Sequence, residues 1–342
     1  MHMLIAFFIF AIVLHTPAFA GKTLDAVKER GVIRCGVNNA LVGFSAPTEK
    51  GDWRGLDVEF CRAVSAAVLG DPDKVEYIPL SASERLLALQ NNKIDILSRN
   101  TTWTLSRDAG LGMRFAGVMF YDGQGFIVPA SLNITEISQL NGTTICVQSG
   151  TTSEVNLVDY FRSHSFTYTP LVFDKFDDSV EAFLSGKCQA YSTDASGLAV
   201  VRARAGSKSE QYVLLEEIIS KEPLGPSVML GDDEWFAINR WVLFALLEAE
   251  EHNITSKNVD ELKISTIDPY KQRLLGVVPG IGKPLVLNDN WFYNIVKKVG
   301  NYGEIYDRSI GQDSPLQLDR GFNGGINLLW TNGGLLYAPS LR

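Results

Sequence analysis

Strand and helix patterns alternate along this chain, and the same alternation occurs twice. The first unit is a strand, a helix, a strand, a helix and a strand, over residues 31–37, 56–69, 75–78, 84–90 and 94–97. Gly70 ends the first of these helices, and Ser81 with Glu84 forms a capping-box pattern before the second. A βαβαβ order predicts a parallel sheet with helices on both faces.

A second unit of the same kind follows the first. Its alternating strands and helices cover residues 144–147, 152–162, 169–173, 177–185, 188–193 and 195–204. Two similar units, rather than one long sheet, predict two α/β lobes. The length of 342 residues supports this division, because a single hydrophobic core stops growing at about 250–300 residues.

The chain is predicted to pass between the two units twice, once outward and once in return. Residues 123–128 form the outward crossing, and the return is marked by two prolines and a glycine over 220–226. A long helix over 233–251 and a tail that packs on the first lobe complete the chain. We therefore expect a hinge between one lobe, made of 21–125 and 224–342, and a second lobe, made of 126–223.

The N-terminus has the pattern of a secretory signal peptide. Residues 4–14 read LIAFFIFAIVL, and Ala18-Phe19-Ala20 supplies the small-x-small pattern that signal peptidase accepts. The apolar run is shorter than the roughly 20 residues that a lasting transmembrane helix needs. We therefore expect a signal peptide over 1–20, cleavage after Ala20 and an exported mature chain.

Export favours a disulfide role for the four cysteines, because an oxidising compartment permits disulfides. Of the three possible pairings, we predict Cys35 with Cys61 and Cys146 with Cys188, since each pair joins segments that a βαβ unit places side by side. The alternative, a set of metal ligands, is disfavoured because no two cysteines are closer than 26 positions and no C-x-x-C pattern is present.

The residues that catalysis usually needs are scarce. Only His164 and His252 lie beyond the leader, each in a helix-end or loop context, and the common hydrolase, zinc-protease, P-loop and dinucleotide patterns are missing from the sequence. We expect a protein that is not an enzyme and that carries neither metal nor cofactor. Acid–base catalysis by two neighbouring carboxylates stays open. The formal net charge of −8 argues against a nucleic-acid partner.

Three polar clusters follow predicted strands, at the edge where open α/β sheets bind ligands. The first, over 98–108, contains Arg107, whose guanidinium suits a carboxylate because it donates two parallel hydrogen bonds. The alternative for Arg107 is a surface ion pair with Asp108.

The second cluster, over 148–154, turns through a glycine into a helix start, which is a natural anion site. The alternative is plain capping by Thr151 with Glu154. The third is Asp194, which either caps the next helix or holds an ammonium group. Taken together, donors for a carboxylate and an acceptor for an amine match the zwitterion of an α-amino acid.

Several longer segments resemble one protein family. These are GLDVEFCRAV over 55–64, IDILSRNTTWTLSRD over 94–108, CVQSGTTSE over 146–154 and IISKEPLGPSV over 218–228. With Asp194 they resemble the periplasmic amino-acid-binding proteins of ABC importers, most closely the general L-amino-acid-binding type, over nearly all of the mature chain.

The resemblance implies a periplasmic-binding-protein fold, in which two α/β lobes close around one amino acid. Each lobe is expected to contain a mainly parallel sheet flanked by helices, and a two-strand hinge joins the lobes. By motif position, Arg107 and Thr102 are expected to hold the ligand α-carboxylate with help from Thr151 and Thr152, and Asp194 the α-ammonium.

One position departs from the family pattern. Leu41 stands where many narrow-specificity relatives place an aromatic residue over the ligand side chain. A smaller lid, with Asn100 and Ser45 as polar neighbours, predicts a roomier pocket and broad specificity. The expected partners are L-amino acids and the permease subunits of an ABC importer in the inner membrane, with the protein itself a monomer in the periplasm. The alternatives are a periplasmic dehydratase or lyase on the same fold and a sensor module.

Overall fold

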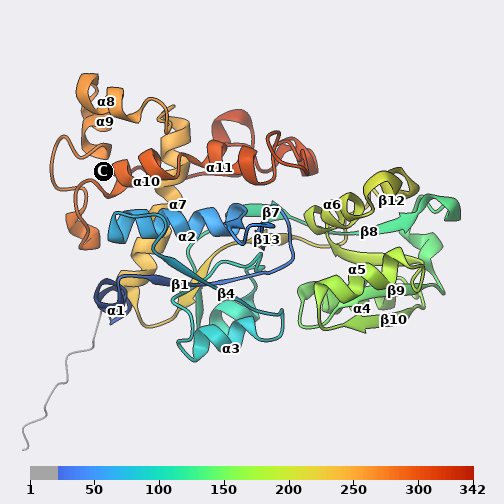
Figure 1. The fold of residues 1–342 in the computed structure, drawn as a ribbon. Helices are drawn as coiled ribbons and strands as arrows, with labels where there is room; N and C mark the ends of the chain where they lie inside the picture. The colour runs from blue at the N-terminus through green and yellow to red at the C-terminus, as the bar shows by residue number, and fades with distance from the viewer. Residues whose placement is uncertain (1–21) are drawn as a thin grey trace, which may run out of the picture.

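The computed structural model describes residues 22–342, so the expected signal peptide lies outside the described residues. Over that range the chain forms two α/β lobes that lie side by side (Figure 1). The sheet of the first lobe has the strand order β4-β1-β5-β14-β6. These strands are, in the same order, Val75–Pro79, Ile33–Val37, Ile96–Leu97, Ser227–Met229 and Met113–Phe115.

The second lobe repeats this plan with the strand order β10-β9-β11-β8-β12. Its strands are, in the same order, Thr169–Phe173, Thr144–Gln148, Ala190–Asp194, Gln124–Pro129 and Tyr212–Leu214. The flanking helices are α4 (Thr152–Ser163), α5 (Phe176–Leu184) and α6 (Ala195–Arg204). The buried side chains of Phe161, Phe183 and Leu198 face the sheet from these helices.

Each sheet is mixed rather than mainly parallel. The strands of the predicted βαβ units do pair in parallel, β1 with β4 and β5, and β9 with β10 and β11. The other four strands, β6, β14, β8 and β12, pair antiparallel. They belong to the segments by which the chain leaves or re-enters a lobe, where no crossover helix sets a parallel direction.

Two short antiparallel strands connect the lobes, β7 (Phe120–Asp122) and β13 (Glu222–Leu224). The outward crossing predicted over 123–128 is therefore placed too late, because β8 begins at residue 124 and already pairs with β11 in the second sheet. The expected lobe boundary at 125/126 falls within β8. The return segment, by contrast, contains β13, as its prolines and glycine suggested.

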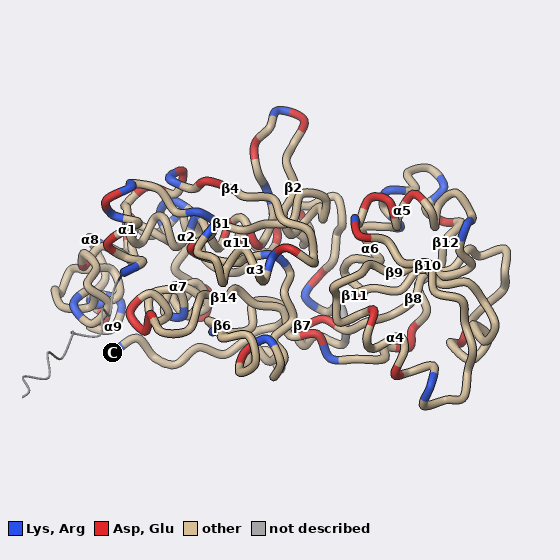
Figure 2. Tube along the Cα trace, turned by 90° about the horizontal axis from the view of Figure 1, so that it is seen from below, with Lys and Arg blue, Asp and Glu red and all other residues tan. Residues whose placement is uncertain are grey.

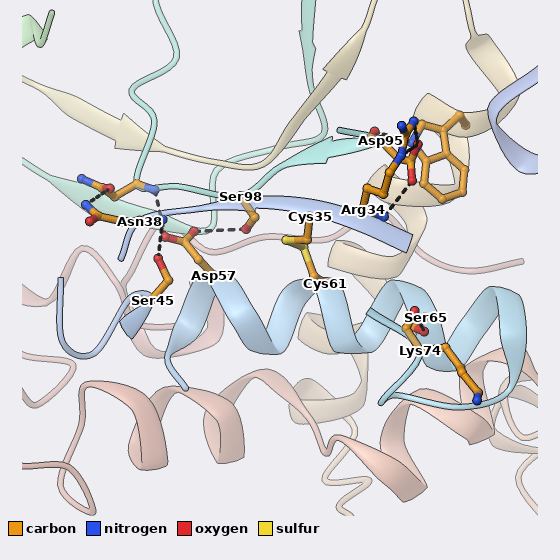
Figure 3. Close-up of a disulfide and its surroundings, with 12 residues drawn as sticks. Arg34, Cys35, Asn38, Ser45, Asp57, Cys61, Ser65, Lys74, Asp95 and Ser98 are labelled. Carbon is orange, nitrogen blue, oxygen red and sulfur yellow. Dashed lines mark hydrogen bonds and ion pairs between the residues drawn. A yellow bond between two sulfur atoms is a disulfide. The ribbon is translucent and has the colours of Figure 1, made fainter. Parts of the chain in front are cut away.

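Both predicted disulfides are present. Cys35 of β1 is bonded to Cys61 of α2 (Leu56–Leu69), and Cys146 of β9 to Cys188, which precedes β11. Figure 3 shows the first bond joining α2 to the strand that it covers. Each disulfide lies within one lobe, so both leave the movement of one lobe against the other unrestricted.

The C-terminal third of the chain packs on the first lobe (Figure 1). Helices α7 (Asp233–Glu251), α10 (Trp291–Lys298) and α11 (Tyr302–Ser309) contact α2 and one another. The remaining helices are α1 (Lys22–Arg30), α3 (Arg85–Gln90), α8 (Val259–Ser265) and α9 (Pro269–Leu274). The buried aromatic side chains of α10 and α11 join the same apolar core as those of α2.

Charged residues of both signs are interspersed along both lobes, and the loop that joins β2 (Ala46–Pro47) to β3 (Trp53–Arg54) projects from the first lobe (Figure 2). Among residues 22–342, no helix is long and apolar enough to cross a membrane.

Candidate functional site

A polar cavity lies between the two lobes, at the carboxyl ends of strands β1, β5, β9 and β11. Its walls combine residues of both lobes: Asn38, Leu41, Arg85, Arg99, Asn100, Thr102, Gln148, Thr151, Thr152, Ser153, Phe176, Thr193, Asp194, Ser196 and Gly197. The edge at which parallel strands end is where open α/β sheets bind ligands. This cavity is therefore the candidate ligand site.

The lobes are closed over the cavity, because side chains meet across it. Thr102 Oγ1 of the first lobe lies 3.3 Å from Thr152 Oγ1 of the second. Ser83 donates to Asp174 Oδ1 at 3.1 Å, and Arg204 of α6 donates to the carbonyl oxygen of Ala40. These contacts join the two lobes on either side of the chain crossings and hold them together at the cavity.

Arg107 lies next to the first-lobe wall, on a single π-helical turn over Ser106–Gly110, and is not itself among the residues that line the cavity. One of its Nη atoms donates to the Thr102 carbonyl oxygen at 2.8 Å, and the side chain is buried. Burial lowers the pKa of Arg107, while Glu222 and Asp194 raise it. With five N–H donors on a guanidinium, most of its hydrogen-bonding capacity remains for a ligand.

The wall on the second lobe is the N-terminus of α4. Thr151 caps this helix, since its Oγ1 accepts a hydrogen bond from Glu154 N at 3.2 Å. The next residue, Thr152, donates to Glu222 Oε2 at 2.8 Å. Free backbone N–H groups at a helix start carry partial positive charge, so this wall favours an anionic group of a ligand.

Asp194 closes β11 and precedes α6, but its side chain makes no capping hydrogen bond. Its carboxylate accepts no hydrogen bond from any residue within 22–342, although it is almost fully buried. Burial raises the pKa of Asp194 well above its usual range, and Asp122 and Glu222 raise it further. A buried carboxylate in this situation is an acceptor for a positively charged group.

Two further carboxylates come from the strands that connect the lobes. Glu222 and Asp122 are opposite each other in the β7–β13 pair, and both are buried. Glu222 accepts hydrogen bonds from Thr152, from Ser220 at 2.6 Å and from Asn156 at 2.8 Å. Asp122 accepts from Ser196 and from Gly123 N, and burial raises its pKa to about 6.

A hydrogen-bond network holds in place the two asparagines, Asn38 and Asn100, that line the cavity from the first lobe (Figure 3). Asp57, in the first turn of α2, accepts from Ser98 Oγ at 3.1 Å and from Asn100 N at 2.8 Å. Asn38 Nδ2 donates to Asn100 Oδ1, and Asn38 N donates to Ser45 Oγ at 2.9 Å. Burial raises the pKa of Asp57 to about 6.

Comparison with known proteins agrees with this geometry. The model of the bacterial extracellular solute-binding proteins, family 3, matches residues 33–312. The chain belongs to this family.

Two relatives of this solute-binding protein match it along almost their whole length. It is 50% identical over 327 residues to the general L-amino acid-binding periplasmic protein AapJ of Rhizobium johnstonii, covering 95% of this chain and 94% of AapJ. It is 46% identical over 325 residues to the glutamate/glutamine/aspartate/asparagine-binding protein BztA of Rhodobacter capsulatus, covering 95% of each.

A solved structure confirms the predicted two-lobed periplasmic-binding-protein fold. An ABC transporter periplasmic binding protein from Brucella ovis, with glutathione bound, is 48% identical and superposes with a TM-score of 0.89. The match covers 94% of this chain and 99% of that one.

The structure brings most of the predicted site residues of this solute-binding protein together. Asn100, Thr102, Thr151, Thr152 and Asp194 all line the cavity. Arg107 is the exception, because it does not line the cavity: it donates to the Thr102 carbonyl oxygen and interacts electrostatically with Glu222 and Asp194 rather than pairing with Asp108.

Ser45, in contrast, does not reach the cavity. It is fully buried and supports Asn38 from below, because its hydroxyl is the acceptor for that residue's backbone N–H. Leu41 does line the cavity, at the position where the family pattern led us to expect a lid. Thr151 has both of the roles weighed for it, since it caps α4 and also lines the cavity.

Sequence reasoning missed five charged residues of the site: Asp57, Arg85, Arg99, Asp122 and Glu222. Arg99 had a usable signal, because it lies two residues after the end of β5, within the first polar cluster. The other four lie on helices or on the connecting strands, where no local pattern distinguishes them from surface charges. His164 and His252 do not line the cavity. Among residues 22–342, no three His, Cys, Asp or Glu side chains gather as metal ligands would.

Proposed function

We propose that this chain is the solute-binding component of an ABC importer for L-amino acids. It would act in the periplasm, as a monomer released from its signal peptide after Ala20, and would deliver its ligand to permease subunits in the inner membrane. The observation that carries the proposal is the arrangement of polar groups around the cavity. The first lobe supplies the Thr102 hydroxyl, with the Arg107 guanidinium bonded to the carbonyl oxygen of the same residue. The second lobe supplies the N-terminus of α4 and the Asp194 carboxylate, which accepts no hydrogen bond within residues 22–342.

This arrangement is complementary to an α-amino acid group. The α-carboxylate would lie between Arg107 and Thr102 on one side and Thr151 and Thr152 on the other, where charged and polar donors converge. The α-ammonium would lie against Asp194. Each charge of the ligand then replaces a hydration shell with a fixed partner, which a buried zwitterion needs.

Closure of the lobes is the proposed mechanism. The carboxylate contacts come from both lobes, while the ammonium contact comes from the second lobe alone. A ligand that bridges the walls binds the closed form more tightly and shifts a pre-existing equilibrium toward it. The two strands β7 and β13 are the only backbone crossings within residues 22–342 and would serve as the hinge. The cavity has a volume of about 30 Å³ in this closed form, and Leu41 is one of its lining residues. The proposal that several different side chains are accepted rests on Leu41 standing where narrow-specificity relatives place an aromatic residue.

The test is isothermal titration of the protein against a panel of L-amino acids, after unfolding and refolding to remove any co-purified ligand. We expect Kd values of micromolar or below for several chemically different members, about −8 kcal/mol or more favourable. Arg107→Ala is expected to weaken binding by about 2–4 kcal/mol with little effect on the fold.

Two outcomes would overturn the proposal. No binding anywhere in the panel would show that the ligand is not an amino acid. The appearance of a product during incubation with a bound amino acid would favour the dehydratase or lyase alternative, which the buried carboxylates of the cavity would then serve. Arg54→Ala is the matched control, because Arg54 is exposed, lies in β3 and does not line the cavity.

A further inference from the structure

One charged side chain of the second lobe reaches the first lobe without lining the ligand cavity. Arg204 is the last residue of α6, and one of its Nη atoms donates to the carbonyl oxygen of Ala40 in the first lobe. Ala40 directly precedes Leu41, which lines the cavity, whereas Arg204 is not among the lining residues. Because the two partners belong to different lobes, opening of the lobes breaks this hydrogen bond.

Arg204 is held in place for this contact by its own lobe. Its other Nη atom is paired with Asp177, in the first turn of α5, and its guanidinium lies over the Phe176 ring, 5.2 Å from the ring centre. Helices α5 and α6 belong to the same lobe, so these two contacts persist when the lobes separate. The side chain therefore loses little conformational freedom when it meets Ala40, and little of the hydrogen-bond energy is offset by ordering.

The loop that carries Ala40 is fixed to the first lobe. Ala40 N donates to Asn38 Oδ1 at 3.0 Å, and Asn38 N donates to Ser45 Oγ at 2.9 Å. Ser45 N in turn donates to the Leu41 carbonyl oxygen at 2.9 Å. Ala40 is thereby fixed relative to Asn38 and Leu41, two residues that line the ligand cavity. A hydrogen bond to Ala40 consequently holds the first-lobe wall of the cavity against the second lobe.

Of the hydrogen bonds that join the lobes at the cavity, that of Arg204 is expected to contribute most to closure. Its donor is charged and the contact is partly buried, and charge-assisted hydrogen bonds are about twice as strong as neutral ones. The contact between the two threonine hydroxyls involves no charge. The contact of Ser83 with Asp174 has a charged acceptor, but it is exposed, so that water competes for both groups.

We propose that Arg204 is a positioning residue that acts as a latch, a contact formed only in the closed form, and that it raises the affinity for every ligand by the same factor. This inference rests on the proposed function and adds the residue that sets its closing equilibrium. The measured Kd increases as the fraction of binding-competent protein falls. Loss of the latch lowers that fraction, and because the latch touches no ligand, the effect is independent of the ligand side chain.

The experiment compares Kd values for several L-amino acids by isothermal titration of ligand-free wild type, Arg204→Met and Arg202→Met. Arg204→Met keeps an apolar stem beside Phe176 and removes the donors. We expect its Kd to rise about threefold to tenfold, by one common factor for all amino acids. Arg202→Met is the matched control, because Arg202 lies on the same helix and pairs with Glu210 of its own lobe at 3.2 Å. Its Kd values are expected to equal those of the wild type.

Stopped-flow kinetics separate a latch from a merely structural role. The ligand enters the open form, in which the latch is already broken, and leaves after the closed form has opened. The dissociation rate of Arg204→Met is therefore expected to rise by the same factor as Kd, with the association rate unchanged. A slower association with an unchanged dissociation rate would contradict the latch.

The outcomes distinguish the latch from the proposed function. Wild-type Kd values in Arg204→Met would overturn the latch and leave the amino-acid function standing, as would losses that differ between amino acids. No binding of any amino acid by the wild type would overturn the proposed function itself, on which the latch rests. Arg204→Lys serves where Arg204→Met folds poorly: it keeps the positive charge, but one ammonium replaces the two Nη atoms that reach Asp177 and Ala40, so its Kd values are also expected to exceed those of the wild type. Equal Kd values would contradict the latch.

Discussion

Replacing Asp194 by Asn tests the electrostatic balance of the cavity. The two side chains are nearly the same size, so the substitution removes a negative charge and little else. In the ligand-free protein this carboxylate is buried, accepts no hydrogen bond within residues 22–342 and faces Asp122 and Glu222. With an amino acid bound, it would be the partner of the ammonium. The negative charge should therefore lower the folding stability of the ligand-free protein and raise its affinity for the ligand.

The size of the binding effect follows from this environment. Removing one partner of a buried, hydrogen-bonded charge pair costs about 2–5 kcal/mol. Because burial and two acidic neighbours raise the pKa of Asp194, part of the binding free energy is used to ionise it, which places the expected loss in the lower half of that range. We expect a loss of about 2–3 kcal/mol in Asp194→Asn, roughly 30- to 150-fold in Kd.

The stability effect has the opposite sign. A carboxyl whose pKa is raised on folding destabilises the folded state as pH rises above its usual value of 3.8. Asp194→Asn removes this penalty, so the ligand-free variant is expected to have a higher Tm than the wild type at neutral pH.

Isothermal titration and calorimetric melts of refolded, ligand-free protein measure both quantities. Asp233→Asn is the matched control, because that side chain is 84% exposed at the start of α7. Wild-type affinity in Asp194→Asn would refute the assignment of the ammonium site. A lower Tm of the empty variant would refute the electrostatic argument.

Three other expectations are open to direct measurement. Gly150→Ala is expected to weaken ligand binding about tenfold or more, because the new Cβ would lie 3.2 Å from the backbone of Ser83 in the other lobe; unchanged affinity in a titration would mean that the lobes do not approach this closely around a ligand. Replacing both Cys146 and Cys188 by Ser opens a loop with a separation of 42 residues and should lower the free energy of unfolding by about 4 kcal/mol in a denaturant titration, whereas a loss below about 1 kcal/mol would contradict the chain-entropy estimate. Ligand binding should release protons and weaken as pH falls, because the ammonium needs the ionised form of Asp194, whose pKa burial raises in the empty protein; calorimetry in buffers of different ionisation enthalpy detects this release, and its complete absence would count against the ammonium contact.

Local patterns in the sequence predicted much of the fold. The bounds predicted for α2, α6 and α7 are those observed, because each helix has a continuous local signal of apolar spacing and end residues. Gly70, for example, ends α2 in the left-handed region at φ 70°, where glycine is favoured. The disulfides were predictable because neighbouring strands and helices of a βαβ unit must lie side by side.

The sequence was less informative wherever distant segments meet. The direction of β6, β8, β12 and β14, and the place of the crossing strands, depend on pairing between segments far apart in the chain. No periodicity within a short window carries that information. The same reason explains why Ser45 was assigned to the site although it lies beneath Asn38.

By itself, the sequence determined that this chain forms two α/β units with ligand-binding groups at their strand ends, because periodicity, capping and strand-end position are local properties. Only the tertiary structure decided which charges meet. Asp122 faces Glu222 through the register of two short connecting strands, and Asp194 joins them from the second lobe. Arg85 and Arg99 meet beside Asp57 because α3, β5 and α2 all pack against β1. Burial strengthens the electrostatic interactions among these charges, since the same groups in water would interact weakly.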